Sequence, residues 1–349
     1  MKIGIITLIG NCNCGNRLQN YAVQYYLKHN EVVTINNNSS YILEVLKRLK
    51  GLKVYIDPKN ERERYKKFIL FNKRINFSKK VYFSNSNLSD LNKFDFLVVG
   101  SDQVWNPTFG RLKDLELLSF ADNNKRIAFS ASFGIDNIPE NMKLKVGEEL
   151  KKFKAISVRE DRGKEIVEEL TGRKDVEVLV DPTMLLRVDE WDKVSKKPKM
   201  LKSKKYILNY FLGDLSYDRK KEIERVAKEN DCDIINMLDR NSQFYACGPS
   251  EFLYLEKNAF LICTDSFHSC VFAILYNRPF IVFDREDKNM ANMNSRIETL
   301  MNKFNLKNRI FTGKITEDNL IHNYDDVYKI LEKERIKAEK FIKKALNTK

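Results

Sequence analysis

The chain has 349 residues, of which 43% are hydrophobic and 32% are charged. This length suits two domains of ordinary size, and the charged fraction excludes a bundle of membrane-spanning helices. The sequence contains no run of about 18 apolar residues, so we expect no transmembrane helix. Its 62 Lys and Arg exceed its 48 Asp and Glu by 62 − 48 = 14 charges.

The excess of positive charge has two readings. A basic surface attracts nucleic acid, anionic lipid or acidic substrates. The lysines are spread along the chain, however, and we find no helix-turn-helix, zinc-finger or RNA-binding signature. We therefore expect a solvated basic surface and no nucleic-acid partner. A substrate at a membrane surface is compatible with this charge.

The cysteines and the N-terminal residues indicate a reducing compartment. The apolar run from Ile3 to Ile9 precedes the polar NCNCGN, which predicts a first β-strand rather than a signal peptide. Six cysteines in such a chain are expected to be reduced thiols in a cytoplasmic protein. Cys12 and Cys14 form a CxC pair, but no second pair follows at zinc spacing, so we expect no metal.

Predicted strands and helices alternate through the first half of the chain. We expect a strand at 3–8, a helix at 16–29 and a strand at 31–36, followed by a Lys/Arg-rich helical excursion at 41–80 that lies outside the core. Further strands are predicted at 94–99, 126–133, 155–160 and 176–182, with helices at 140–153 and 161–170. This alternation predicts an α/β fold with a parallel sheet.

A basic linker, KVSKKPKMLKSKK at 193–205, separates two such blocks. The second block has predicted strands at 206–213, 233–238, 259–265 and 279–284, and helices at 217–230, 249–257, 267–276 and 295–304. An amphipathic helix is expected at about 324–347. We therefore predict an N-terminal domain at 1–192 that forms the acceptor side, a linker at 193–205, a second domain at 206–323, and a C-terminal helical segment at 324–349 that can pack back on the first domain.

Polar residues gather where the predicted strands end. Ligands of parallel α/β sheets bind beyond the carboxyl ends of the strands. The polar clusters at these places are Asn11–Arg17, Gly100–Asn106, Arg159–Asp161, Asp181, Asp265–His268 and Asp284–Lys288. Ordinary loop polarity is the alternative, but the concentration of Arg, Asp and His favours a site in a cleft between the two domains.

Several of these residues suit the binding of an anion. Arg159 is a planar fork donor for carboxylate or phosphate, unless it forms a surface salt bridge with Glu160 or Asp161. Arg285 and Lys288 add cations after a later strand. Asn16, Arg17 and Ser266 stand at predicted helix starts, where backbone N–H groups face outward and favour negative charge.

His268 is one of three histidines in the chain. Asp265 and Ser266 are expected to cap the helix that follows, which places His268 in its first turn. The helix dipole there disfavours a charged imidazole, whereas an anionic substrate favours it, and this suits a residue that exchanges a proton. The alternative is a structural histidine bonded to a backbone carbonyl.

Ser101 and Asp102 belong to the second polar cluster, GSDQVWN, whose Trp105 either stacks on a sugar or base or fills the core. The sequence lacks GxGxxG, Walker, GxSxG and HExxH motifs. Their absence disfavours nucleotide-hydride enzymes, P-loop NTPases and serine hydrolases.

Several blocks together resemble the polysaccharide pyruvyl transferase family. They are GNRLQNYAVQ, FDFLVVGSDQVWN, RIAFSASFG, ISVREDRG, LVDPTMLL followed by Trp191, and LICTDSFHSCVFAILYNRPFIVFDR. The blocks occur in family order over about residues 1–300. Two departures are the Ser269-Cys270 pair, where small Gly-Thr-type residues are usual, and the NCNC at 11–14.

The resemblance implies a GT-B-like fold, with two Rossmann-like parallel-sheet domains facing a cleft. It implies transfer of the enolpyruvyl group of phosphoenolpyruvate onto two hydroxyls of a sugar, in a cell-surface polysaccharide or its lipid-linked precursor. The product is a pyruvate ketal, phosphate is released, and no metal or other cofactor takes part. By motif position the family's acidic-ligand arginine falls on Arg159, its catalytic histidine on His268, and a further basic residue on Arg285 or Lys288.

The predicted site follows from both lines of reasoning. Its catalytic residues are His268 and Arg159, and its substrate-binding residues are Arg285, Lys288, Ser266, Asp265, Asn16, Arg17, Ser101 and Asp102. Two other functions remain open: a GT-B glycosyltransferase that uses a nucleotide sugar, and a non-catalytic sugar-binding protein of an envelope-assembly complex. We expect a cytoplasmic protein, with peripheral attachment to the inner face of the membrane as an option.

Overall fold

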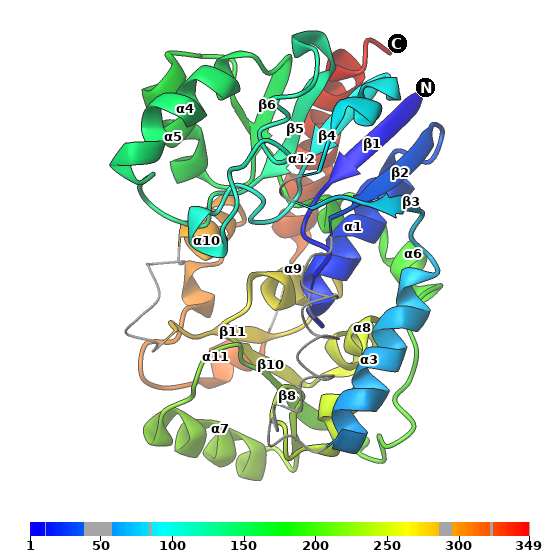
Figure 1. The fold of residues 1–349 in the computed structure, drawn as a ribbon. Helices are drawn as coiled ribbons and strands as arrows, with labels where there is room; N and C mark the ends of the chain where they lie inside the picture. The colour runs from blue at the N-terminus through cyan, green and yellow to red at the C-terminus, as the bar shows by residue number, and fades with distance from the viewer. Residues whose placement is uncertain (11, 38–57, 84–85, 286–294, 322–323, 349) are drawn as a thin grey trace.

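Two parallel β-sheets, one for each half of the chain, organise the molecule (Figure 1). The computed structural model describes residues 1–10, 12–37, 58–83, 86–285, 295–321 and 324–348. Figure 1 shows the first sheet above the second, with helices α1 (Cys14–Tyr26) and α9 (Phe267–Leu275) between them.

The first sheet has seven strands in the order β3-β2-β1-β4-β5-β6-β7. All neighbouring strands pair in parallel. Its central strands β4 (FLVV) and β5 (RIAFSA) are mostly apolar and buried at every position, as expected for a parallel sheet covered by helices. The strands are β1 (Lys2–Ile6), β2 (Glu31–Asn36), β3 (Phe77–Val81), β4 (Phe96–Val99), β5 (Arg126–Ala131), β6 (Ala155–Val158) and β7 (Glu177–Val178).

Helices connect these strands. Besides α1 they are α3 (Pro58–Asn72), α4 (Glu140–Lys151), α5 (Asp161–Thr171) and the short α6 (Val188–Asp192). The Asn13 side chain caps α1 by accepting a hydrogen bond from the backbone of Asn16. Gly172 ends α5 in the left-handed conformation (φ 73°), which glycine adopts without steric cost. Cap residues thus set the helix ends that precede and follow the strands.

The predicted excursion at 41–80 is partly wrong. Residues 41–57 of that range lie outside the described residues. The remainder forms α3 and β3, and β3 pairs with β2 at the edge of the first sheet. Its sequence, FSKKV, is short and half exposed, and carries two lysines. These are features of an edge strand. Such a strand has no buried apolar run, so the sequence pattern does not mark it as a strand.

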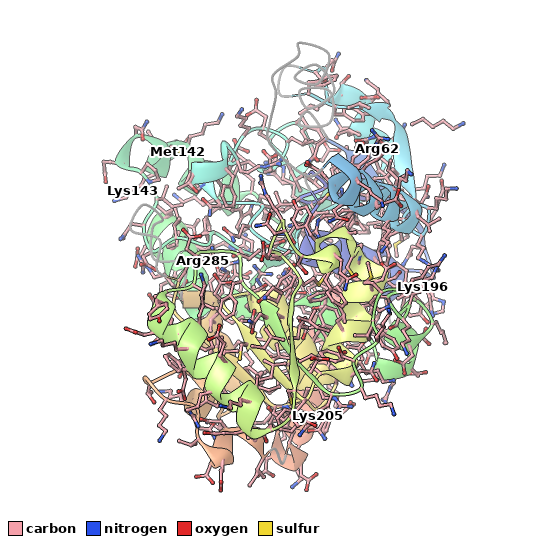
Figure 2. The ribbon with its side chains drawn as sticks, turned by 90° about the horizontal axis from the view of Figure 1, so that it is seen from below. Arg62, Met142, Lys143, Lys196, Lys205 and Arg285 are labelled. Carbon is pink, nitrogen blue, oxygen red and sulfur yellow. The ribbon has the colours of Figure 1, made fainter. Side chains whose placement is uncertain are left out.

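The second sheet has four parallel strands in the order β11-β10-β8-β9. The strands are β8 (Tyr206–Tyr210), β9 (Asp233–Asn236), β10 (Leu261–Thr264) and β11 (Phe280–Val282). The helices between them are α7 (Tyr217–Glu229), α8 (Pro249–Asn258) and α9, and α10 (Ser295–Lys303) follows β11. The linker before β8 carries exposed lysines, among them Lys196, which Figure 2 labels at the margin of the molecule.

The chain then returns to the first sheet. A short helix, α11 (Glu317–Leu320), precedes the long helix α12 (Asp325–Ala345). Arg335 of α12 donates to the carbonyls of Met184 and Leu186, both at 2.9 Å. Further along α12, the Phe341 ring stacks on Phe129 of β5 at 6.3 Å between centroids. No helix in the described part of the chain is long and apolar enough to cross a membrane.

Candidate active site

Polar side chains from three strand ends of the first sheet meet in its interior. Ser101 and Asp102 follow β4, Arg159 follows β6, and Asp181 follows β7. The Ser101 hydroxyl donates to Asp181 Oδ2 at 2.9 Å. Arg159 donates through Nη1 to Asp181 Oδ2 at 2.7 Å and through Nη2 to Asp102 Oδ1 at 3.2 Å. The carboxyl ends of parallel strands therefore converge here as predicted.

Arg159 is thus already engaged with two carboxylates. Its side chain is 1% exposed, and burial of a guanidinium is tolerated only with such partners. The sequence predicted a fork open to a substrate. Instead, the two terminal nitrogens of the Arg159 guanidinium bind Asp181 and Asp102. The two carboxylates are buried, and their ionised forms need a positive charge beside them.

The two carboxylates remain ionised despite their burial. Burial alone would raise the pKa of Asp181, but the neighbouring His268 and the charge of Arg159 outweigh it and hold that pKa far below its usual range. For Asp102, burial is likewise opposed by Arg159 and then by His268, and its pKa is lowered. The site therefore contains fixed negative charge at ordinary pH.

His268 joins this group from the second sheet. It lies in the first turn of α9, directly after β10, as its sequence context predicted. Its Nε2 lies 3.7 Å from Asp181 Oδ2, which is an ion-pair distance and too long for a hydrogen bond. Nε2 is buried without a hydrogen-bond partner among the described residues. The imidazole is therefore not a core histidine satisfied by a backbone carbonyl at this nitrogen.

Residues beside His268 seal the contact between the two halves. The Phe267 ring covers the Arg159 guanidinium at 4.2 Å from its centroid. On the other side, Gly15 of α1 approaches the imidazole so closely that a Cβ there would lie 2.6 Å from His268 Cγ. The next residue, Asn16, donates to Asp102 Oδ2. Glycine at position 15 thus leaves room for the histidine ring.

Asp265 has a different role from the predicted helix cap. Its carboxylate accepts from the backbone of Leu212 (2.7 Å) and Gly213 (2.9 Å) and from Arg285 Nε (3.1 Å). Ser266 occupies the N-cap position of α9, but its side chain makes no capping bond. Asp265 therefore ties together the loops that follow β8, β10 and β11. Figure 2 labels Arg285, the residue that this carboxylate orients.

Arg296 of α10 belongs to the same region and escaped sequence analysis. Its side chain is buried, and burial together with the neighbouring Arg159 lowers its pKa to about 10. With its side-chain amide oriented to satisfy its neighbours, Gln103 accepts hydrogen bonds from Arg296 Nη1 at 2.7 Å and Arg296 Nη2 at 2.9 Å. In sequence, Arg296 is one of 62 Lys and Arg residues and lies on an amphipathic helix, so only the fold identifies it.

The remaining predicted residues lie apart or outside the described chain. Arg17 is buried in α1 with its guanidinium 5.9 Å from the centre of the Phe68 ring, and burial lowers its pKa to about 10. Lys288 lies outside the described residues, so the choice between Arg285 and Lys288 is open.

Two open readings are settled by the structure. Trp105 fills the core: it is fully buried and donates from Nε1 to the carbonyl of Glu116 at 3.0 Å. Ser269 donates to Glu256 of α8 at 2.6 Å, and Cys270 is buried in the apolar core. The unusual Ser269-Cys270 pair therefore packs α9 against α8.

The described residues contain no group of three or more His, Cys, Asp or Glu that could hold a metal ion. Cys14 is fully buried, and burial raises the pKa of its thiol to about 12. That thiol is protonated at neutral pH and is a poor metal ligand in this state.

Comparison with solved structures identifies the fold. The UDP-GlcNAc 2-epimerase of Methanocaldococcus jannaschii has a TM-score of 0.53 at 14% identity, over 95% of this chain and 92% of that chain. A Listeria monocytogenes protein assigned as a UDP-N-acetylglucosamine 2-epimerase has a TM-score of 0.51 at 11% identity, over 97% and 91%. These similarities confirm the predicted GT-B-like α/β fold and carry no information on substrate. No curated protein matches the chain.

A sequence model of the family described as polysaccharide pyruvyl transferase matches residues 13–287. This range is most of the chain, and it contains His268, Arg159 and both carboxylates that hold Arg159. The resemblance seen in the sequence blocks is thereby confirmed, and the chain belongs to the polysaccharide pyruvyl transferase family.

Proposed function

We propose that this protein transfers the enolpyruvyl group of phosphoenolpyruvate onto two hydroxyls of a sugar, forming a pyruvate ketal and releasing phosphate. Membership of the family supports a transferase acting in polysaccharide formation. The observation that carries the proposal is the position of His268, whose unpartnered Nε2 lies 3.7 Å from Asp181 where the two sheets meet. An acid/base residue beside a buried carboxylate suits proton transfer to a substrate.

The donor is an anion, and the site offers cations to it. Phosphoenolpyruvate carries a carboxylate and a phosphate, which guanidinium groups bind through paired hydrogen bonds. Arg285 is aimed by Asp265, and Arg296 is buried with its Nε lacking a partner among the described residues. A buried cation whose pKa is depressed gains stability from an incoming anion. We assign donor binding to Arg285 and Arg296, and a positioning role to Arg159.

The proposed reaction proceeds in two steps, an addition and a displacement. His268 delivers a proton to the methylene carbon of phosphoenolpyruvate, which becomes a methyl group, and the first sugar oxygen bonds to the adjacent carbon. The proton of that hydroxyl replenishes His268. The second sugar oxygen then bonds to the same carbon while the bond to the phosphate oxygen breaks, and its proton leaves with the phosphate. Neighbouring guanidiniums stabilise the negative charge that develops on the leaving group.

The acceptor belongs to a cell-surface polysaccharide or its lipid-linked precursor in this proposal. A basic surface suits approach to an anionic membrane that carries such a precursor, with the protein on the cytoplasmic side. No metal or other cofactor is required, because the guanidiniums of the site supply positive charge.

The test is phosphate release from phosphoenolpyruvate, assayed with a panel of free glycosides and lipid-linked sugars. Mass spectrometry should find the acceptor converted to its pyruvate ketal. Thermal-shift measurements with UDP-, GDP- and CMP-sugars run beside it, because a glycosyltransferase of the same fold would be stabilised by one of them. Stabilisation and turnover with a nucleotide sugar, and none with phosphoenolpyruvate, would contradict the proposal.

A further inference from the structure

A cavity lies in the C-terminal half, at the carboxyl ends of β8 and β9. Its volume is about 460 Å³, within the range of small-molecule sites. The walls come from β8 and the loop after it, from the first turns of α7, and from β9 and the residues that follow it. No residue assigned to the donor lines this cavity, yet it opens at the edge of the sheet where ligands of this fold class bind.

Two asparagines line the cavity, the buried Asn209 and the exposed Asn236. Asn209 Nδ2 donates to Asn236 Oδ1 at 2.8 Å. Asn209 is 7% exposed, and its Oδ1 has no hydrogen-bond partner among the described residues. A buried amide oxygen without a donor costs free energy that a ligand hydroxyl would recover. Phe211 and Leu238 add apolar wall, which suits the C–H face of a sugar ring.

The charge of the cavity excludes phosphate-bearing ligands. Its rim carries the carboxylates of Asp214, Glu224 and Asp239 and the single ammonium of Lys220, a sum of 1 − 3 = −2. A nucleoside diphosphate or phosphoenolpyruvate would be repelled there. Carboxylates and amides are, in contrast, good acceptors for hydroxyl groups. The lining thus favours a neutral, hydroxyl-rich ligand.

The cavity adjoins the donor side of the site. Gly213, which lines it, donates its backbone N–H to Asp265, the carboxylate that also orients Arg285. A Cβ on Gly213 would lie 2.8 Å from Arg285 Cγ, so the backbone and that side chain are in direct contact. Strand β8 neighbours β10, which leads into His268, at a spacing of about 4.8 Å. A ligand in the cavity can therefore reach toward the reacting centre.

We propose that this cavity binds the neutral sugar ring of the acceptor, an assignment that rests on the proposed function. The acidic cavity and the cationic arginines then sort the two substrates by charge. The anionic donor is held by Arg285 and Arg296, and the uncharged sugar is held by Asn209, Asn236 and the rim carboxylates. This places the acceptor contacts in the second half of the chain.

The test uses a matched pair of exposed residues on α7. Glu224 lines the cavity, and Lys228, one helical turn later, does not. Saturation-transfer NMR measures binding of methyl β-galactoside, methyl β-glucoside and methyl α-mannoside to the full chain. Glu224→Trp, which fills the cavity, should weaken the binding of any glycoside that the native protein takes up by at least about tenfold. Lys228→Trp should leave it unchanged, and Asp239→Ala should weaken it without adding bulk.

The outcomes separate this inference from the proposed function. If phosphate is released from phosphoenolpyruvate but Glu224→Trp and Asp239→Ala keep the native acceptor KM, the cavity assignment is overturned and the function stands. If glycosides bind and Glu224→Trp blocks them while no acceptor supports phosphate release, the cavity is a sugar site and the proposed function fails. Binding of UDP or GDP in the cavity, or of no glycoside at all, overturns the assignment.

Discussion

His268 and Asp181 come from different sheets, and neither would serve the proposed chemistry alone. The imidazole stands in the first turn of α9, and the carboxylate that faces it follows β7. Arg159 and Ser101 both donate hydrogen bonds to that carboxylate. A carboxylate fixed in this way orients the imidazole and balances the charge that forms on it during proton transfer.

Replacing His268 by Ala should lower the rate of phosphate release from phosphoenolpyruvate by roughly 10²–10⁴-fold, the usual contribution of general acid–base catalysis. The arginines are untouched, so stabilisation of the protein by phosphoenolpyruvate in a thermal-shift assay should persist. Tyr328→Ala, a change on the outer face of α12, serves as the control. Near-normal turnover of His268→Ala would remove this histidine from the mechanism.

Arg296→Met should raise the KM for phosphoenolpyruvate by about tenfold or more, because a charge-assisted bond to the donor is lost. The change also removes two hydrogen bonds that Arg296 donates to Gln103, so the melting temperature should fall, and KM is compared at a temperature where the variant stays folded. Arg296→Lys, which keeps the charge, should recover part of the affinity. An unchanged KM in Arg296→Met would leave Arg285 as the donor-binding residue among those described.

Asp181→Asn should destabilise the protein at pH 7 by about 3–5 kcal/mol, because Arg159 loses a buried partner. The folded-state pKa of Asp181 is depressed, so its contribution is complete above the unfolded pKa of about 4 and is lost as pH falls below it. The gap in melting temperature between native and variant protein should therefore narrow from pH 4 to pH 3. A gap that stays constant across pH 3–7 would show that the ionised form of Asp181 contributes nothing. Asp122→Asn, at an exposed residue, should show no gap at any pH.

At the scale of elements, periodicity and strand-end position predicted most of the fold. Alternating apolar runs located the strands that became β4, β5, β8 and β10, and strand ends located the polar residues that meet in the site. Strand β3 was missed, because its alternation is polar and its pairing with β2 depends on the sheet. Arg296 was missed for a similar reason: its hydrogen bonds with Gln103 and its proximity to Arg159 arise only in three dimensions.

The capping prediction for α9 failed in an instructive way. Asp265 has the residue type and spacing of a cap, but three donors from neighbouring loops compete for its oxygens. Local sequence shows the nearby helix end that Asp265 could cap, but it does not show the backbone N–H of Leu212, which lies more than fifty residues earlier in the chain and binds Asp265 instead. The same limit applies to Ser269, whose partner Glu256 lies on another helix.

Glu256→Gln should make the pH dependence of stability flatter. Burial raises the pKa of Glu256 well above its usual value, and its carboxyl accepts from Ser269. Because the folded-state pKa is raised, the protonated form stabilises fully below the unfolded pKa of about 4.3, and this contribution is lost as pH rises toward the folded pKa. The melting temperature of the native protein should fall relative to Glu256→Gln between pH 5 and pH 8. Glu229→Gln, on the surface of α7, should leave the dependence of the melting temperature on pH unchanged. If the curves of melting temperature against pH for the native protein and Glu256→Gln run parallel, the pKa of Glu256 is not raised by folding.

For the whole molecule, the site depends on how the two halves are held together. The contacts of His268 with Asp181 and of Phe267 with Arg159 join the sheets directly. Helix α12 adds a second connection, because it follows the C-terminal half and packs on β5 of the first sheet. The two halves are therefore linked both through the reacting centre and through the C-terminal helix.

Phe341→Ala should test the second connection. Phe341 is buried against Phe129, and truncation of a buried Phe costs about 3–5 kcal/mol of unfolding free energy. Ile336→Ala, at an exposed position of the same helix, should cost about 0.5 kcal/mol or less. Urea unfolding of both variants measures this difference. Equal losses would mean that α12 does not stabilise the first sheet.

The return of α12 also sets an order of events during synthesis. The ribosome completes all seven strands of the first sheet by residue 178, yet the aromatic face of β5 awaits Phe341, more than 150 residues later. Until then the nascent chain exposes apolar surface that the finished protein covers. The reacting centre likewise needs His268, so neither half matures before the other has been made. A ribosome that stops within the last helix would release a chain with both sheets in place and part of β5 uncovered, a substrate for chaperones or proteases.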